Sequence, residues 1–161
     1  MFQVGEYIVH PGQGVCKVAD IEMGDNPVYK LLPMGMRHPM LISYPLSCED
    51  KLRAVITSDE AEALIDDYAD MELDTHVSRS RALEERHYRT VMKEGSCQDT
   101  IRIVKTLSKR IQDALDENKH PPVVYKRIFK EARDRSLEEL SVALDKTPEQ
   151  VEALLLVEEG E

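Results

Sequence analysis

Basic side chains in the middle of the chain are the residues whose type and spacing point most directly to chemistry, namely the binding of phosphate. The 161-residue chain has a net charge of −10, but residues 79–135 carry 15 Lys and Arg against 9 Asp and Glu. A guanidinium group can bind two phosphate oxygens at once, and an ammonium group adds a point charge. This segment can therefore attract nucleic acid. The candidates for DNA contact are Arg79, Arg81, Arg86, Arg89, Lys126, Arg127 and Lys130.

The segments on either side are acidic and favour protein partners instead. Residues 1–74 carry 5 Lys and Arg against 14 Asp and Glu, and residues 136–161 carry 1 against 8. Acidic surfaces repel phosphate, so neither segment suits DNA. Basic residues scattered along helices are also common on ordinary solvated faces, and this interpretation of the basic segment stays open.

Side chains that could perform catalysis or bind metal are not grouped in the sequence. The five histidines are dispersed, and none adjoins a serine or cysteine in a recognised nucleophile setting. Gly12 and Gly14 precede a strand-like run rather than a helix, so they do not form a phosphate-binding glycine loop. Three widely spaced cysteines fit neither a disulfide framework nor a zinc site. We therefore expect no enzyme, no catalytic residues, no cofactor and no metal.

Short β-strands are predicted for the first part of the chain. β-forming runs occur around residues 4–9, 15–23, 28–32, 40–44 and 52–56. A turn at His10-Pro11-Gly12-Gln13-Gly14 folds the first run back on the second, and a change of phase near Val18 and Ala19 predicts a β-bulge. Five short strands can close into a small barrel that hides most of its edges. An ordinary hairpin of any small β domain remains the alternative.

Helices are predicted for the rest of the chain. The run Thr57-Ser58-Asp59-Glu60 can cap a helix whose apolar face, with Ala61 and Ile65, we expect to pack on the barrel. Further helices are predicted from Ser78 and Gln98, after Pro121-Pro122, and at capping-box patterns beginning at Ser136 and Thr147. The predicted domains are residues 1–70, an acidic linker at 71–77, and a helical domain at 78–161.

The order VGEYIVHPGQGVCKVADIE at residues 4–22 resembles the start of the CarD/CdnL family of bacterial transcription regulators. The first module of that family is shared with transcription-repair coupling factors. The resemblance continues through ISYPLSCEDKLRAVITSDEAEALI at residues 42–65 and weakens after about residue 70. It implies an α+β fold in which a small five-stranded Tudor-like β-barrel is followed by an all-α domain.

The resemblance also implies a function in transcription initiation. In the family, the barrel docks on the β subunit of RNA polymerase, and the helical domain reaches promoter DNA. By resemblance, the polymerase-binding residues are Ile21, Met23, Leu41, Ile42 and Ser43. Val77-Ser78-Arg79 is similar to the family's Trp-Ser-Arg, so Val77 joins the DNA candidates. In some family members this tryptophan wedges against the DNA at the edge of the melted region. The chain has no tryptophan, so it cannot make that contact.

Other functions stay open at this point. The chain could be a polymerase- or protein-binding adaptor that does not touch DNA, and the apolar residues named for polymerase could simply fill the barrel. Ser43 stands where some family members have an arginine, which removes any salt bridge made from that position. No apolar run approaches the roughly 18 residues of a spanning helix, and the start MFQVGEYIV lacks a basic leader. We therefore expect a cytoplasmic, nucleoid-associated protein with no membrane or small-molecule partner.

Overall fold

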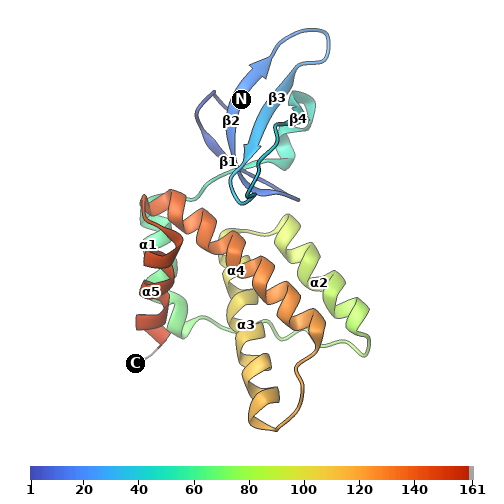
Figure 1. Cartoon of the computed structure of the whole chain (residues 1–161), viewed down its shortest axis with the longest axis vertical. Helices are drawn as coiled ribbons and strands as arrows, with labels where there is room; N and C mark the ends of the chain where they lie inside the picture. The colour runs from blue at the N-terminus through green and yellow to red at the C-terminus, as the bar shows by residue number, and fades with distance from the viewer. Residues whose placement is uncertain (160–161) are drawn as a thin grey trace.

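The computed structural model describes residues 1–159 and places an antiparallel sheet on one end of a group of helices (Figure 1). Over those residues, five strands form the sheet: β1 (Tyr7–His10), β2 (Gly14–Glu22), β3 (Val28–Pro33), β4 (Ile42–Pro45) and β5 (Arg53–Ala54). Their order is β4-β3-β2-β1-β5, so β4 and β5 are the edge strands. The predicted α+β class, with a Tudor-like antiparallel sheet ahead of helices, is confirmed.

The turn between β1 and β2 has the chemistry that its sequence predicts. His10 Nδ1 accepts hydrogen bonds from the amides of Gly12 and Gln13 at 3.0 and 3.1 Å. Gly14 has φ of +77°, a conformation that costs glycine little because it has no Cβ. The turn is therefore closed by a side chain that the strand itself supplies.

The predicted bulge lies in β2, where the register with β3 shifts between Val18 and Asp20. Val18 pairs with Leu31 before the shift, and Ile21 pairs with Tyr29 after it. The extra residue lets both Val18 and Ile21 pack in the core of the sheet, although three positions separate them. That core consists of Ile8, Cys16, Val18, Tyr29, Leu31 and Leu52.

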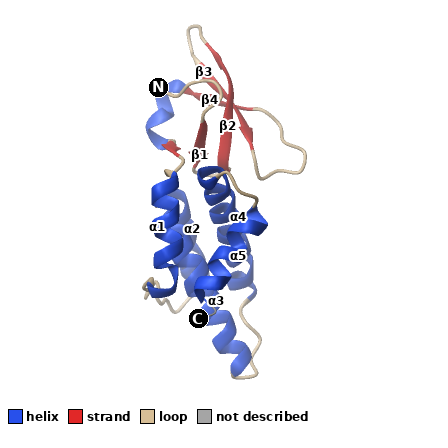
Figure 2. Cartoon of the chain, turned by 90° about the vertical axis from the view of Figure 1, so that its left-hand side faces the viewer, coloured by secondary structure: helices blue, strands red, loops and turns tan. Residues whose placement is uncertain are grey.

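The helical part follows the sheet in the chain and lies beneath it in two perpendicular views (Figures 1 and 2). Its elements are a 3₁₀ turn η1 (Leu46–Lys51) beside the sheet, then α1 (Ser58–Asp67), a 3₁₀ turn η2 (Tyr68–Asp70), α2 (Arg81–Glu94), α3 (Cys97–Asp116), α4 (Val123–Leu144) and α5 (Pro148–Glu159). The predicted helical domain extends to residue 161, and its last two residues lie outside those described.

Paired side-chain caps begin several of these helices. Thr57 and Glu60 form the expected capping box at α1, and Thr147 and Gln150 exchange the equivalent bonds at α5. Ser96 and Asp99 form a third box at α3, which therefore begins at Cys97. α2 begins at Arg81 rather than near Ser78.

The expectation that α1 packs on the barrel is wrong. Ala61 of α1 and Tyr68 of η2 are buried in one cluster with Ile101 of α3, Leu140 of α4 and Val151 of α5. The core face of the sheet is already covered by Phe2, Leu46 and Leu52, so the apolar stripe of α1 turns to the helices. α1 is thus a member of the helical bundle.

The helix start predicted at Ser136 is also wrong, because α4 continues through it. Ser136 is buried, and its Oγ donates a hydrogen bond to the Ala132 carbonyl at 2.7 Å. A serine can satisfy its hydroxyl within a helix in this way, so the capping-box pattern is met without a helix end. One consequence is that α4, with 22 residues, spans both the helical bundle and the underside of the sheet.

Candidate protein and nucleic-acid interfaces

Three of the residues predicted for polymerase contact, Leu41, Ile42 and Ser43, lie at the β4 edge of the sheet, and the other two, Ile21 and Met23, lie in and just after β2. Ser43 of β4 pairs with Lys30 of β3, and its Oγ accepts a hydrogen bond from Lys30 Nζ at 2.7 Å. Lys30 Nζ also lies 3.8 Å from a carboxylate oxygen of Glu22. Met23 and Leu41, which are 70% and 58% exposed, lie just beyond opposite ends of the paired strands. Met23, Leu41 and Ser43 are therefore all open to a partner.

Ile21 and Ile42, the other two predicted contacts, have a different environment. Both are partly buried and pack against the core of the sheet. Ile42 pairs with Leu31, whose side chain is fully buried. Ile42 therefore anchors the β4 edge to the core of the sheet, whereas Ile21 lies in β2, two strands away from that edge.

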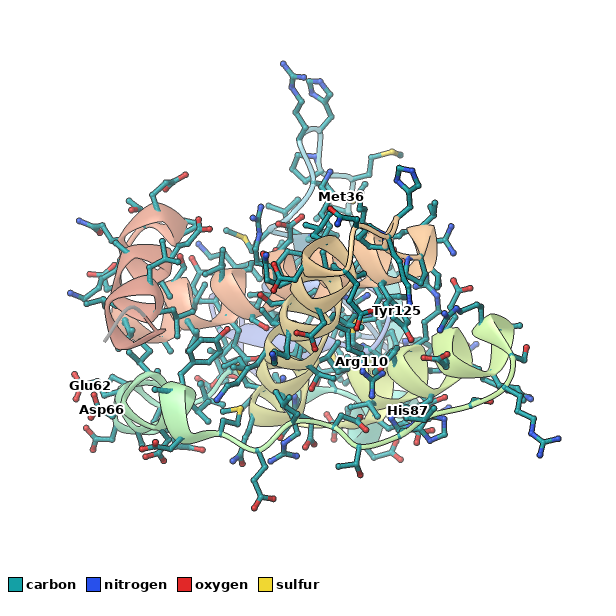
Figure 3. All side chains as sticks on the ribbon, turned by 90° about the horizontal axis from the view of Figure 1, so that it is seen from below. Met36, Glu62, Asp66, His87, Arg110 and Tyr125 are labelled. Atoms are coloured by element: carbon teal, nitrogen blue, oxygen red, sulfur yellow. The ribbon has the colours of Figure 1, made fainter. Side chains whose placement is uncertain are left out.

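Exposed methionines in the β3–β4 connection extend this surface and were missed in the sequence. Met34, Met36 and Met40 are 43%, 47% and 74% exposed. Met36 is labelled in Figure 3. Methionine side chains are flexible and polarizable, so exposed ones are typical of adaptable protein-binding surfaces. The signal available in the sequence was the run of methionines in a connection rich in glycine and proline.

Two of the predicted DNA contacts, Arg89 and Arg127, meet where α2 and α4 adjoin. Glu85 Oε1 accepts from Arg89 Nε at 3.1 Å and from an Arg127 guanidinium nitrogen at 2.8 Å. Glu131 of α4 accepts from Arg89 at 2.8 Å. We call these four residues the α2–α4 seam. The hydrogen bonds from Arg127 and Arg89 hold the pKa of Glu85 below its usual value, so it stays ionised near neutral pH.

Arg81 belongs to a buried network rather than to this seam. It donates to Glu84 Oε1 at 2.7 Å and to the Tyr125 hydroxyl at 2.8 Å. Glu84 is 2% exposed, and it also accepts from the Tyr125 hydroxyl. Arg110 approaches the same carboxylate at 3.7 Å and donates to the Tyr88 hydroxyl. Arg81 is thus committed to satisfying a buried charge.

The remaining DNA candidates are exposed, and within residues 1–159 they make no ion pair. They are Arg79, Arg86, Lys126 and Lys130. Arg86 lines a shallow hollow of about 390 Å³ on α2 together with Glu85, Arg89 and Lys93. Val77, which is 78% exposed, precedes α2. The free cations therefore lie next to the seam on α2 and α4, with Arg79 in the segment before α2.

The acidic segment at 71–77 is bound along α3. Arg110 donates to the carbonyls of Asp74 and His76 at 3.2 and 2.9 Å, and Thr106 Oγ1 accepts from the Asp74 amide. Asp74 also lies 2.7 Å from His87 Nε2, and the His76 ring stacks on His87 with centroids 3.9 Å apart. In Figure 3, Arg110 and His87 lie together below Tyr125. Burial alone would raise the pKa of Asp74, but the hydrogen bonds that its carboxylate makes with His87 and with the His76 amide outweigh burial and lower the pKa.

Three polar side chains near the C-terminal end of α4 hold the sheet against the helices. Arg135 donates to the carbonyls of Pro11 and Gly12 at 3.2 and 2.8 Å. Glu138 Oε1 accepts from the Val15 amide at 3.0 Å. Glu139 accepts two bonds from Arg53, both at 2.6 Å, and one from the Ile56 amide.

We call Arg135, Glu138 and Glu139 the α4 clamp. Glu139 was not singled out in the sequence because its partners are more than 80 residues away. The clamp fixes the β1–β2 turn and the β5 edge to one helix, so the sheet and the seam share a rigid support.

Among the residues that the structure describes, no group of His, Cys, Asp or Glu side chains is placed to hold a metal ion. Within the same part of the chain, no helix has the length and apolar character needed to cross a membrane.

Comparison with known proteins gives one family. Residues 2–56, which contain the sheet, match the CarD-like/TRCF RID domain. No curated protein matches the chain. The matched domain is a non-enzymatic protein-interaction domain that indicates a transcription factor interacting with RNA polymerase. The helical part lies outside the match. Over residues 2–56, the chain is therefore similar to the CarD-like/TRCF RID domain.

Proposed function

We propose that the chain modulates transcription initiation by binding the β subunit of RNA polymerase with its sheet and promoter DNA with its helical part. The observation that carries the proposal is that the family match coincides with a sheet whose edge strand β4 is preceded by the exposed Leu41, while the exposed Met23 follows β2 at the other end of the paired strands. The α4 clamp engages the β1–β2 turn and β5, and β5 is the opposite edge of the sheet from β4. Docking there leaves the helices free.

The β4 edge suits a protein partner for physical reasons. An edge strand offers unpaired backbone groups to which a strand of another protein can add. Leu41, just before β4, supplies apolar area to bury, and Ser43 carries no charge that burial would penalise. Met23 adds apolar area beyond the end of β2. Residues 1–74 are acidic, which favours a basic protein surface over DNA.

The DNA contact is supported by the position of the free cations. Arg86, Lys126 and Lys130 are exposed on the two helices that meet at the seam. The α4 clamp relates this surface to the sheet, so a polymerase-bound sheet would present it in one orientation. Of the seven arginines and lysines named from the sequence, Arg81 is exposed but paired with the buried Glu84, and the other six lie at the surface of α2, α4 and the preceding segment.

Binding to an isolated β lobe of RNA polymerase tests the first half of the proposal. We expect wild type to bind in calorimetric titration, and Met23→Asp combined with Leu41→Asp to weaken binding at least about tenfold, since buried carboxylates are costly. The matched control is Leu115→Asp, because Leu115 is 50% exposed near the end of α3, away from the sheet. Absence of binding by the wild-type chain would falsify the polymerase assignment.

A polymerase-binding adaptor that does not contact DNA is the second candidate, and the seam favours it because Glu85 and Glu131 neutralise two of the predicted DNA contacts. Titration of promoter DNA at several salt concentrations separates the candidates. DNA contact predicts binding that weakens steeply with salt and is lost in Arg86→Glu combined with Lys126→Glu. Output of a transcription assay that is unchanged by this double variant would favour the adaptor.

A further inference from the structure

The α2–α4 seam joins two carboxylates to the arginines that the proposed function assigns to DNA. A single oxygen of Glu85 receives hydrogen bonds from both helices, from Arg89 and from Arg127. Glu131 receives a second bond from Arg89. Arg89 and Arg127 are 43% and 52% exposed, so this is an arrangement at the surface and not a buried core network.

The bonds that Glu85 and Glu131 accept are those that a phosphate would accept. Carboxylate and phosphate oxygens bind the same planar N–H groups of a guanidinium. A DNA phosphate that binds the same N–H groups of Arg89 or Arg127 therefore competes with a carboxylate, and at the other N–H groups it still meets the negative charge of that carboxylate. The neighbouring cations Arg86, Lys126 and Lys130 face no such competitor within the described residues.

Resting on the proposed function, we propose that Glu85 and Glu131 are internal competitors for DNA phosphate, which hold the affinity of the free protein for DNA low. An exposed ion pair is weak, so the competition is small enough for a nearby DNA to overcome. Docking of the sheet on polymerase supplies that proximity, because tethering raises the effective concentration of the seam at the DNA to about the millimolar range. The seam then engages DNA next to polymerase and leaves other DNA unbound.

The test compares the double variant Glu85→Gln/Glu131→Gln with Glu62→Gln/Asp66→Asn in the full-length chain. Both remove two negative charges. Glu62 and Asp66 lie on α1, on the opposite side of the molecule from α2 in Figure 3, and both are exposed. Binding of a labelled promoter duplex is measured by fluorescence anisotropy from about 50 to about 200 mM salt.

We expect the seam variant to bind DNA about 3- to 10-fold more tightly than the α1 variant, since one or two weak ion pairs are released. The slope of log affinity against log salt should become steeper by the amount that corresponds to about one to two more phosphate contacts. Adding Arg89→Gln and Arg127→Gln to the seam variant should abolish both gains. In parallel, the affinity for the polymerase β lobe should stay equal in all variants.

Equal DNA affinities for the seam and α1 variants, with wild type binding DNA, would overturn the competitor role and leave the proposed function standing. If neither wild type nor any variant binds DNA at the lowest salt, the DNA half of the proposed function fails, and the competitor role fails with it. Loss of β-lobe binding in the seam variant alone would also contradict the inference, because it would place the seam in the polymerase contact.

Discussion

Glu138 is a half-buried carboxyl group at the junction of α4 and the sheet. Burial raises its pKa to about 7, and Asp134 and Glu139 add to this, while the Val15 amide and Arg135 oppose it. The ordinary value is 4.5, so the folded protein holds this proton more tightly than the unfolded chain does. The group therefore contributes stability that is fully present below about pH 4.5 and is lost as pH rises through about 7.

We expect Glu138→Gln to remove this pH dependence. Glutamine keeps an oxygen that can accept from the Val15 amide, but it cannot ionise. As pH rises from about 5 to about 8, the free energy of unfolding of wild type should therefore decrease relative to that of the variant. Urea denaturation at a series of pH values measures the difference. A difference that stays constant over this range would show that Glu138 titrates normally.

Glu139 has the opposite character, because its charge is buried and paired. Its side chain is 5% exposed, and Arg53 donates to both carboxylate oxygens. We expect Glu139→Ala to lower the free energy of unfolding by about 3–5 kcal/mol, since it leaves a partly buried guanidinium without its partner. The double variant Arg53→Met/Glu139→Met should lose less. Urea denaturation of Arg53→Met, Glu139→Met and the double variant completes the cycle, and additive losses would argue against a coupled pair.

At the scale of elements, α3 organises the segment that the sequence marks as a linker. Lys105 donates to three carbonyls, those of Tyr68, Ala69 and Met71, at 2.7–2.8 Å. One ammonium group has three N–H donors, so this set uses all of them. The end of η2 and the start of the acidic segment are thereby fixed to the helix bundle, and the segment at 71–77 does not act as a loose tether.

We expect Lys105→Met to release these carbonyls while keeping the aliphatic part of the side chain. Bonds to a charged donor contribute about 1.5–3 kcal/mol, so a loss of that order in the free energy of unfolding is expected. Hydrogen exchange at residues 71–76 should also become faster, because the segment opens locally. Lys109→Met is the matched control, since Lys109 pairs with Asp113 of the same helix on the exposed side of α3. Equal exchange in the two variants would contradict the role of Lys105.

At the scale of the whole molecule, the sheet and the helices form one body through the α4 clamp. Arg135 and Glu138 engage the β1–β2 turn, and Glu139 engages Arg53 and the Ile56 amide. Gly35, in the β3–β4 connection, also approaches Glu138 so closely that an added Cβ would lie 2.5 Å from its Oε2. The proposed coupling between polymerase and DNA depends on this rigidity.

We expect Arg135→Ala to loosen the junction without unfolding either part. Two hydrogen bonds to the β1–β2 turn are lost, and the Val15 amide, which donates to Glu138, should exchange with solvent roughly 5- to 10-fold faster, equivalent to about 1 kcal/mol. Hydrogen exchange followed by NMR measures this. Amides in the core of α3 should keep their protection, and a uniform increase throughout the chain would indicate global destabilisation instead.

Local patterns in the sequence predicted the features that depend on neighbouring residues. The phase change at Val18 located the bulge, and Thr57 with Glu60 located a helix start. Long-range choices were beyond this reasoning. The apolar stripe of α1 indicates that one face is buried, but it does not indicate which element that face packs against. Ser136 fits a capping-box pattern although it lies in the middle of a helix.

The interfaces divide in the same way. Counting charges located the basic helices, because the sum of charges needs no coordinates. It could not show that Arg81 belongs to a buried network or that Arg89 and Arg127 share Glu85, since their partners on the other helix are more than 40 residues away. The residues predicted for polymerase and DNA contact remain predictions.

α4 carries both the α4 clamp and part of the α2–α4 seam, so a rotation of the sheet about the clamp moves the seam residues of α4. Arg127 lies about 16 Å along the helix axis from Glu138 at 1.5 Å per residue. The sheet is attached to α4 at the Glu138 end. If the sheet and α4 tilt together by about 10° about that end, Arg127 moves through an arc of about 3 Å, roughly the length of a hydrogen bond. The angle at which the sheet seats on its partner would thus steer which backbone group of the DNA this guanidinium can reach.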